Sequence, residues 1–170
     1  MLKRLNNPCT PNFLTAKTFI LSNQFNWGYY PSTIEGSTDI DVPFYVHSFL
    51  DRPNPKKNSF HSEVKDSNLN AMSVILNEIT AANDIQINVL YRLAANAVHP
   101  LPEQVATPKH RDHTFPHLNM LIYLTNAGGN TVCEEDVYEP KENDVIIFEG
   151  DHYHYTPKSE RRVVLVATFA

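Results

Sequence analysis

Short β-forming segments follow one another closely through the second half of the chain, and they constrain the fold more than any other feature. The apolar or alternating runs lie at 85–93, 118–125, 131–133, 137–140, 145–148 and 162–169. Turn-forming residues separate these runs, as is typical of antiparallel strands. Helical and strand-like segments do not alternate and no repeat is visible, which disfavours a parallel βαβ fold. We therefore predict a mainly β protein, an antiparallel sandwich or barrel of the jelly-roll kind, with room for a ligand between its sheets.

One amphipathic helix is predicted ahead of these strands. Residues 69–82 place apolar side chains at spacings of three and four, and Asn68 precedes them as a candidate N-cap. We expect this apolar stripe to cover the outer face of a sheet. Further upstream, 42–50 is predicted as a strand with proline near its start, and 32–42 and 51–60 are predicted as surface loops.

The N-terminal segment offers weaker signals. Residues 1–12 carry Pro8 and Pro11 among polar residues and are predicted as an irregular arm. The aromatic side chains between 25 and 30 are expected to pack in the core, because aromatic rings bury a large apolar area. His47 stands alone in its strand and is interpreted as a structural residue.

Length and charge limit the possible classes of protein. A chain of 170 residues is expected to form one domain, 1–170, with an N-terminal supporting region of about 1–83 and a β-rich core of about 84–170. The formal net charge is −5 and the basic residues are scattered, so no nucleic-acid partner is indicated. The sequence does not indicate an oligomeric state.

Cysteine content and hydropathy bear on the compartment. Cys9 and Cys133 are the two cysteines, and their separation suits neither a disulfide framework nor a cysteine-based zinc site. No apolar run reaches the length of a membrane span, so no membrane association is expected. These features favour a cytoplasmic protein, in the host cytoplasm if the source is a virus.

The segment His110-Arg111-Asp112 carries the first candidate metal ligands. On an extended backbone, residues i and i+2 face the same side, so the imidazole and the carboxylate can bind one ion. Both side chains bind metals in their deprotonated forms, which are accessible near neutral pH. The segment follows the proline-rich loop 99–108 and precedes a β-rich run, where the mouth of a pocket is expected.

A third ligand is expected from the segment 150–155. His152 and His154 share strand parity, so alternation does not separate them, and turn geometry favours His154. Two histidines and one carboxylate with open coordination positions suit a non-haem Fe(II) that activates dioxygen. The alternative is a polar strand edge whose histidine pair binds nickel or zinc adventitiously.

Arg162 is the candidate anchor for an anionic co-substrate. A hairpin through 156–160 would bring it alongside His154, and a guanidinium presents a planar fork of donors to a carboxylate. An arginine entering so apolar a strand would be costly to bury without a partner. The alternative is that Arg161 and Arg162 are both solvated residues at the start of the strand.

These residues resemble a known family. The segment from His110 to Phe169 is similar to the catalytic core of the Fe(II)- and 2-oxoglutarate-dependent dioxygenases, in particular the prolyl-hydroxylase-like and small phage or bacterial types. The pattern of that family is His-x-Asp, a Gly-Gly-x-Thr turn, a distal histidine and a basic anchor. The matching residues are His110 and Asp112, Gly128 to Thr131, His154, and Arg162. The matches favour His154 over His152 and Arg162 over Arg161.

Upstream landmarks extend the resemblance over nearly the whole chain. Residues 25–30, 44–49 and 92–96 look like N-terminal landmarks of small oxygenases of this type. Two departures are visible: the spacing from His154 to the next proline is one residue shorter than the commonest pattern, and the loop before His110 is long.

The resemblance implies a double-stranded β-helix with one or two covering helices. It also implies an iron site of His110, Asp112 and His154, with 2-oxoglutarate and O₂ as co-substrates and ascorbate as a candidate auxiliary reductant. The distal carboxylate of 2-oxoglutarate would pair with Arg162, helped by Tyr91, Asn96 or Tyr123. The implied reaction hydroxylates a C–H bond of a peptidyl, amino-acid or other small-molecule substrate and releases succinate and CO₂.

Two other hypotheses belong to different classes. A cupin-like module could bind a metal or a sugar without turnover, because a fold does not fix a function; in that case Arg162 would lie outside the pocket and 2-oxoglutarate would not bind. A structural viral protein would carry the histidines on its surface and would take up no metal. The joint presence of the metal-ligand pattern, the glycine turn and the anchor arginine favours the enzyme.

Overall fold

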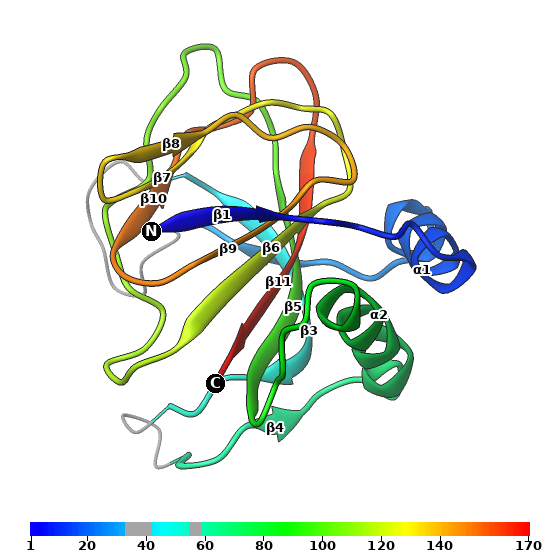
Figure 1. Cartoon of the computed structure of the whole chain (residues 1–170). Coiled ribbons are helices and arrows are strands. Elements are labelled where there is room, and N and C mark those ends of the chain that lie inside the picture. The colour runs from blue at the N-terminus through cyan, green and yellow to red at the C-terminus, as the bar shows by residue number, and fades with distance from the viewer. Residues whose placement is uncertain (33–41, 55–58) are drawn as a thin grey trace.

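Two β-sheets face one another, and two helices lie outside them (Figure 1). The computed structural model describes residues 1–32, 42–54 and 59–170. In this part of the chain the helices are α1 (Pro11–Leu21) and α2 (Leu69–Ala81). The strands are β1 (Leu2–Leu5), β2 (Gly28–Tyr30), β3 (Phe44–Asp51), β4 (Glu63–Val64), β5 (Leu90–Val98), β6 (Leu118–Tyr123), β7 (Thr131–Cys133), β8 (Asp136–Tyr138), β9 (Val145–Phe148), β10 (His152–His154) and β11 (Arg162–Phe169).

The large sheet has the order β1-β9-β6-β11-β5-β3-β2, with β4 paired to β3. The small sheet has the order β10-β7-β8. All of these pairs are antiparallel, which confirms the predicted antiparallel sandwich. Strand β11 lies between β6 and β5 and is buried along its whole length, so the prediction of a central final strand is also confirmed.

Helix α2 covers the outer face of the large sheet, as its apolar spacing predicted. Met72, Ile75, Leu76 and Ile79 are buried in the main core. Asn68 stands at the N-cap position without a side-chain capping bond. Its backbone N–H instead donates to the carboxylate of Asp66 at 2.6 Å, in an Asx turn that leads into the helix.

The N-terminal arm is more regular than predicted. Residues Leu2–Leu5 form the edge strand β1 against β9, and helix α1 follows it directly. Thr10 caps this helix by accepting a hydrogen bond from the backbone N–H of Phe13 at 3.1 Å, and Pro11 occupies its first turn. Thr10 and Pro11 form a recognisable helix start in the sequence, but Pro8 and Pro11 were interpreted together as signs of an irregular loop.

The aromatic cluster divides between core and surface. Phe25 is buried, as predicted, but Tyr29 and Tyr30 are 60% and 50% exposed on β2, which ends the large sheet. The structural role expected for His47 is confirmed: its ring nitrogens lie 2.8 Å from the carbonyl oxygen of Asn26 and 2.9 Å from the carboxylate of Asp66.

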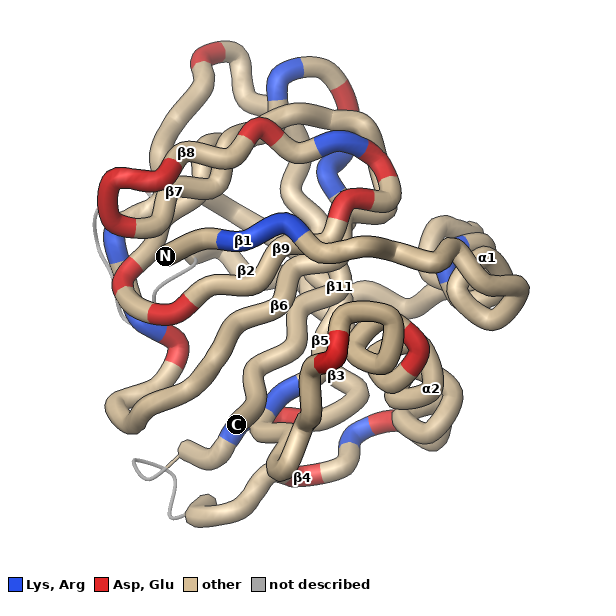
Figure 2. The backbone as a smooth tube through the Cα atoms, in the orientation of Figure 1, with Lys and Arg blue, Asp and Glu red and all other residues tan. Residues whose placement is uncertain are grey.

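The loop prediction for 32–42 falls largely outside the described residues. In 51–60, Asp51 ends β3, Asn54 and Ser59 form an isolated antiparallel bridge, and 55–58 lie outside the described residues. In the view of Figure 2 the lysine and arginine positions are scattered along the backbone among acidic ones and form no single basic stripe. Within the described residues, neither helix combines the length and the hydrophobicity that a bilayer crossing requires.

Candidate metal centre

A cavity of about 430 Å³ opens between the two sheets, within the size range of small-molecule sites. Its floor is the inner face of the large sheet, where alternate residues of β5, β6 and β11 point inward. The lining residues are Phe44, Arg52, Arg92, Asn96, Val98, Thr107, His110, Arg111, Asp112, Leu121, Tyr123, His152, His154, Arg162, Val164 and Val166. The cavity therefore brings together most of the residues that the sequence singled out.

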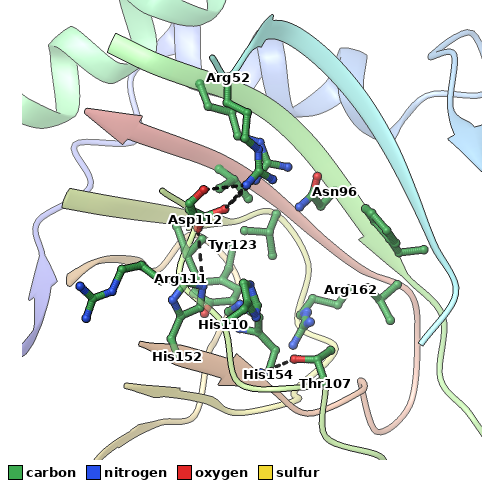
Figure 3. Close-up of a pocket in the computed structure, with 16 residues that line it drawn as sticks. Arg52, Asn96, Thr107, His110, Arg111, Asp112, Tyr123, His152, His154 and Arg162 are labelled. Carbon is green, nitrogen blue, oxygen red and sulfur yellow. Dashed lines mark hydrogen bonds and ion pairs between the residues drawn. The ribbon is translucent and has the colours of Figure 1, made fainter. Parts of the chain in front are cut away.

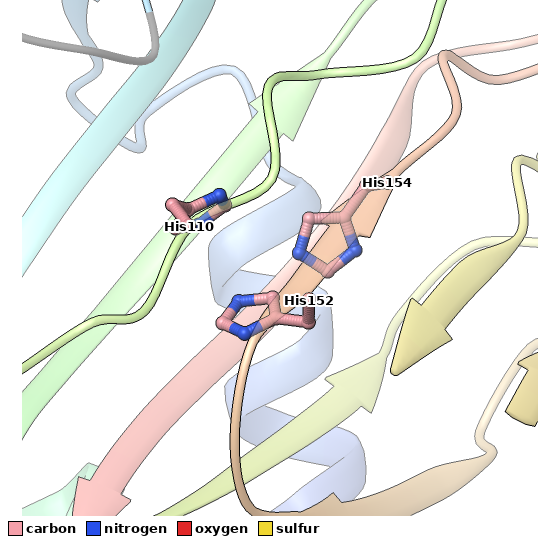
Figure 4. A group of neighbouring side chains, drawn as sticks. All are labelled: His110, His152 and His154. Atoms are coloured by element: carbon pink, nitrogen blue, oxygen red, sulfur yellow. The ribbon is translucent and has the colours of Figure 1, made fainter. Parts of the chain in front are cut away.

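Three imidazoles converge in this cavity (Figure 4). The potential ligand atoms of His110, His152 and His154 all lie within 4.8 Å of one another. The backbone sets this arrangement, because His110 pairs with His152 in an antiparallel bridge and the N–H of Thr107 donates to the carbonyl oxygen of His154 at 2.8 Å. The segment before Asp112 thus extends the small sheet along β10. His152 and His154 point to the same side, as their shared parity predicted.

Hydrogen bonds to Nδ1 orient the three rings. The Nδ1 of His110 lies 3.0 Å from the carbonyl oxygen of Pro108, and that of His152 lies 3.3 Å from the carbonyl oxygen of Gly150. Because a carbonyl oxygen can only accept, Nδ1 carries a proton in both rings, so in the neutral form of each ring the lone pair is on Nε2, the tautomer that binds metals through that atom. The Nδ1 of His154 lies 2.9 Å from the hydroxyl of Thr131, which can donate or accept, so this partner fixes no tautomer.

Asp112 lies beside the imidazoles and is held by two arginines (Figure 3). Its Oδ1 is 3.2 Å from Nη1 of Arg92 and 3.2 Å from Nη1 of Arg52, while its Oδ2 is 3.6 Å from Nε2 of His152. Burial alone would raise the pKa of Asp112, but the charges of Arg92 and Arg52 outweigh it and lower the pKa well below its usual range. The carboxylate is therefore ionised, with one oxygen turned toward the imidazoles.

The same environment favours neutral imidazoles. Burial lowers the pKa of His152 to about 4, although the charge of Asp112 acts in the opposite direction. Burial also lowers the pKa of His154 well below its usual value, and the charges of His152 and Arg162 add to the effect. At neutral pH His152 and His154 therefore offer lone pairs rather than positive charges, as the ligands of a divalent transition metal must.

Arg162 projects into the cavity from the start of β11 (Figure 3). It is buried, and its Nη1 donates to the carbonyl oxygens of Gly129 and Tyr155 at 2.9 Å each. The second of the two glycines in the Gly-Gly-x-Thr turn makes this contact possible, because a Cβ on Gly129 would lie 2.9 Å from Nη1 of Arg162. Arg161 instead places its guanidinium over the ring of Trp27, 5.7 Å from the ring centroid.

The three auxiliary residues predicted for the co-substrate have different positions. Tyr123 lines the cavity, and its hydroxyl is 2.6 Å from that of Thr131, which links it to His154. Asn96 also lines the cavity, and its Oδ1 is buried without a partner among the described residues. Tyr91 is not among the lining residues, and its ring packs against His113 and Phe115.

Sequence reasoning missed the two arginines on Asp112. Arg92 is a single charge within the buried strand β5, a signal that could have marked it as a residue with a buried partner. Arg52 follows β3 in a segment interpreted as a surface loop, and nothing in the sequence linked it to Asp112.

Comparisons with known proteins support the fold. No protein-family model matches the chain, and no curated protein matches it in sequence. Among solved structures, it is similar to an oxidoreductase of the 2OG-Fe(II) oxygenase family from Burkholderia pseudomallei, with a TM-score of 0.63, 15% identity, and coverage of 92% of this chain and 78% of the other.

Two further structures are similar. One is a prolyl hydroxylase from Trichoplax adhaerens in complex with a hypoxia-inducible-factor peptide fragment, with a TM-score of 0.61, 10% identity, and coverage of 99% and 82%. The other is a non-heme α-ketoglutarate-dependent epimerase from nogalamycin biosynthesis, with a TM-score of 0.56, 10% identity, and coverage of 99% and 77%. The chain has the double-stranded β-helix fold of the 2OG-Fe(II) oxygenases. The resemblance seen in the sequence is confirmed at the level of this fold.

Proposed function

We propose that the protein is a non-haem Fe(II)- and 2-oxoglutarate-dependent dioxygenase that hydroxylates a C–H bond. The observation that carries this proposal is the shared cavity of imidazoles, an ionised carboxylate and a buried arginine. The fold alone would not suffice, because one fold hosts many functions. The donor set fits Fe(II), since neutral imidazoles and a carboxylate on one side of a pocket leave coordination positions open to ligands.

His110 and Asp112 would hold the iron together with a distal histidine. When bound, Fe(II) with 2-oxoglutarate supplies the activation of O₂ and the oxidation of the substrate, with release of succinate and CO₂. Arg92 holds Asp112 through Oδ1, which orients Oδ2 toward the metal position. The carbonyl oxygens of Pro108 and Gly150 accept hydrogen bonds from Nδ1 of His110 and His152, which leaves Nε2 of each ring as the atom that would bind the metal.

The far side of the cavity suits the distal carboxylate of 2-oxoglutarate. The guanidinium of Arg162 is held there by two backbone carbonyl oxygens, so it is oriented before any ligand arrives. Burial raises the pKa of Tyr123 to about 12, so its phenol stays protonated and can donate a hydrogen bond. Leu121, Val164 and Val166 form an apolar wall that excludes water.

Two imidazoles compete for the role of distal ligand. The family pattern favours His154. Two contacts favour His152 instead: its Nε2 lies 3.6 Å from Oδ2 of Asp112, and its Nδ1 faces the carbonyl oxygen of Gly150. If His152 were the ligand, His154 would remain beside the metal-binding residues on the side of Arg162.

This extra imidazole is the observation that favours a second candidate function. A metal bound by three histidines and Asp112 would have two octahedral positions left, and a chelating oxo acid would fill both. A site of that kind would bind a metal or a ligand without oxygen chemistry, as in a non-catalytic cupin-like module.

Anaerobic titration of the metal-free protein with Fe(II) and then 2-oxoglutarate separates the two functions. The dioxygenase is expected to show the visible charge-transfer band of the iron chelate, and Arg162→Met is expected to weaken 2-oxoglutarate binding with little loss of iron. Iron binding without the band would favour the non-catalytic module. Failure to bind iron would contradict both functions.

A further inference from the structure

Arg52 gives the cavity a positive charge that the proposed chemistry does not use. Fe(II) contributes two positive charges, Asp112 one negative, 2-oxoglutarate two negative and Arg162 one positive, so these groups together are neutral. Arg92 adds a positive charge that lies close to two carboxylates, Asp112 and Asp51. In the described part of the chain Arg52 pairs with Asp112 alone, and the site is then left with a net positive charge.

Orienting Asp112 does not require both arginines. Arg92 is nearly enclosed, with 12% of its side chain exposed, and its Nη1 contacts Oδ1 of Asp112 directly. Arg52 is 41% exposed, and its Nη1 is shared between Oδ1 and the backbone carbonyl oxygen of Asp112. Because both contacts use one nitrogen, Nε and Nη2 of the guanidinium fork have no partner among the described residues and can donate to a second acceptor.

An unpaired acceptor lies on the same side of the cavity. Oδ1 of Asn96 is buried without a partner among the described residues, and an unsatisfied buried polar atom costs stability unless a ligand or water meets it. Figure 3 shows Asn96 near the arginine end of the cavity, opposite the imidazoles. A donor pair from Arg52 and an acceptor from Asn96 are complementary to a carboxylate with a neighbouring N–H.

We propose that the primary substrate is a small amino acid-like carboxylate, with its carboxylate on Arg52 and its N–H on Oδ1 of Asn96. This inference rests on the proposed dioxygenase function, because it places the substrate beside a metal at Asp112. The cavity of about 430 Å³ suits a small molecule next to the co-substrate. The carboxylate would pair with the guanidinium of Arg52, and the ammonium group of a free amino acid, which is a zwitterion, would donate to Oδ1 of Asn96.

The test uses the whole protein loaded with Zn²⁺ and 2-oxoglutarate, a redox-silent state in which binding is measured without turnover. Calorimetry first establishes that Zn²⁺ and 2-oxoglutarate bind. Ligand-observed saturation-transfer NMR then screens the standard L-amino acids against the corresponding amino-acid amides, and calorimetry gives the affinity of each compound that binds. We expect at least one amino acid to bind, and its amide, which lacks the carboxylate, to bind at least tenfold more weakly.

The variant Arg52→Met is expected to weaken amino-acid binding at least tenfold while 2-oxoglutarate affinity stays within about twofold, since a charge-assisted bidentate contact is lost. Arg4→Met is the matched control, because Arg4 also pairs with a buried carboxylate, Asp144, but outside the cavity. Equal binding of amino acids and amides, no binding of any amino acid, or equal behaviour of the two variants would overturn the inference. The comparison of amino acid with amide uses the unaltered protein, so it decides the matter even if Arg52→Met folds poorly. If Zn²⁺ or 2-oxoglutarate itself fails to bind, the proposed function falls first.

Discussion

The variant Gly129→Ala tests whether the glycine turn holds Arg162 in place. Gly129 has a φ of +84°, and its added Cβ would lie 2.7 Å from the carbonyl oxygen of Tyr155 and 3.0 Å from that of Thr156. The left-handed backbone costs alanine about 1–2 kcal/mol, and overpacking against fixed backbone typically costs about 1–3 kcal/mol more. The free energy of unfolding is thus expected to fall by about 2–5 kcal/mol. For a chain of this length the melting temperature should fall by roughly 4–20 °C.

Gly128→Ala is the matched control. Gly128 also has a positive φ, +67°, but its Cβ would meet only the flexible side chain of Lys158, at 3.4 Å and beyond. This variant should therefore lose only the backbone contribution of about 1–2 kcal/mol. The difference between the two variants isolates the steric contact at Gly129.

The two variants should also differ in ligand binding. The Cβ at position 129 would lie 2.9 Å from Nη1 of Arg162, so the guanidinium has to move from its two carbonyl partners. We expect 2-oxoglutarate affinity, measured by calorimetry on Zn²⁺-loaded protein, to fall at least tenfold in Gly129→Ala and to change little in Gly128→Ala. Thermal unfolding followed by circular dichroism gives the stabilities. If the two variants prove equally stable and bind the oxo acid equally well, the reasoning about this turn is refuted.

Further predictions concern the imidazoles and their surroundings. We expect His152→Ala to lower Zn²⁺ affinity by calorimetry more than His154→Ala does, because His152 contacts Asp112; the reverse order would identify His154 as the ligand. The variant Thr131→Val should destabilise the protein by about 1–3 kcal/mol in urea denaturation, because the hydroxyls of Tyr123 and Thr131 and the ring of His154 form one buried chain; unchanged stability would argue against that chain. Burial is the main cause that lowers the pKa of His113 and of His152 from 6.5 to about 4, so the unfolded chain binds protons first as the pH falls. The free energy of unfolding of the metal-free protein should therefore be highest above about pH 6.5 and should fall by roughly 2–3 kcal/mol per histidine between pH 6.5 and 4. A free energy of unfolding from urea denaturation that does not change over this pH range would contradict the expectation.

The fold was largely predictable from the sequence because strand periodicity and turn residues agreed. Strands 131–133, 145–148 and 162–169 were predicted with the bounds that the structure shows. Strand β5 was predicted at 85–93 but lies at Leu90–Val98. The C-terminal part was missed because its alanines and Asn96 have low strand propensity, and pairing with β3 and β11 holds them in the sheet. Tertiary pairing, which no local window contains, decides such boundaries.

The candidate site was predictable only in part. The spacing of His110 and Asp112 and the polar residue at the start of an apolar strand, Arg162, pointed to the cavity. Turn geometry and the family pattern favoured His154, but strand alternation does not separate it from His152, because both face the same side of β10, and the contacts of their ring nitrogens differ. Arg52 was missed because a contact over 60 residues leaves no trace in local pattern.

The geometry of the site is set by backbone ladders rather than by any one motif. His110 is opposite His152, His154 is opposite Thr131, and Val164, two residues after Arg162, is opposite Tyr123. A slip of one residue in any of these pairs would turn a site residue to the other face of its sheet. The buried apolar residues of β6 and β11 make such a slip costly, because it would expose the core. The packing that stabilises the sandwich therefore also fixes the separation between the metal ligands and the arginine anchor. The sequence motifs supply the side chains, and the strand register determines where those side chains lie.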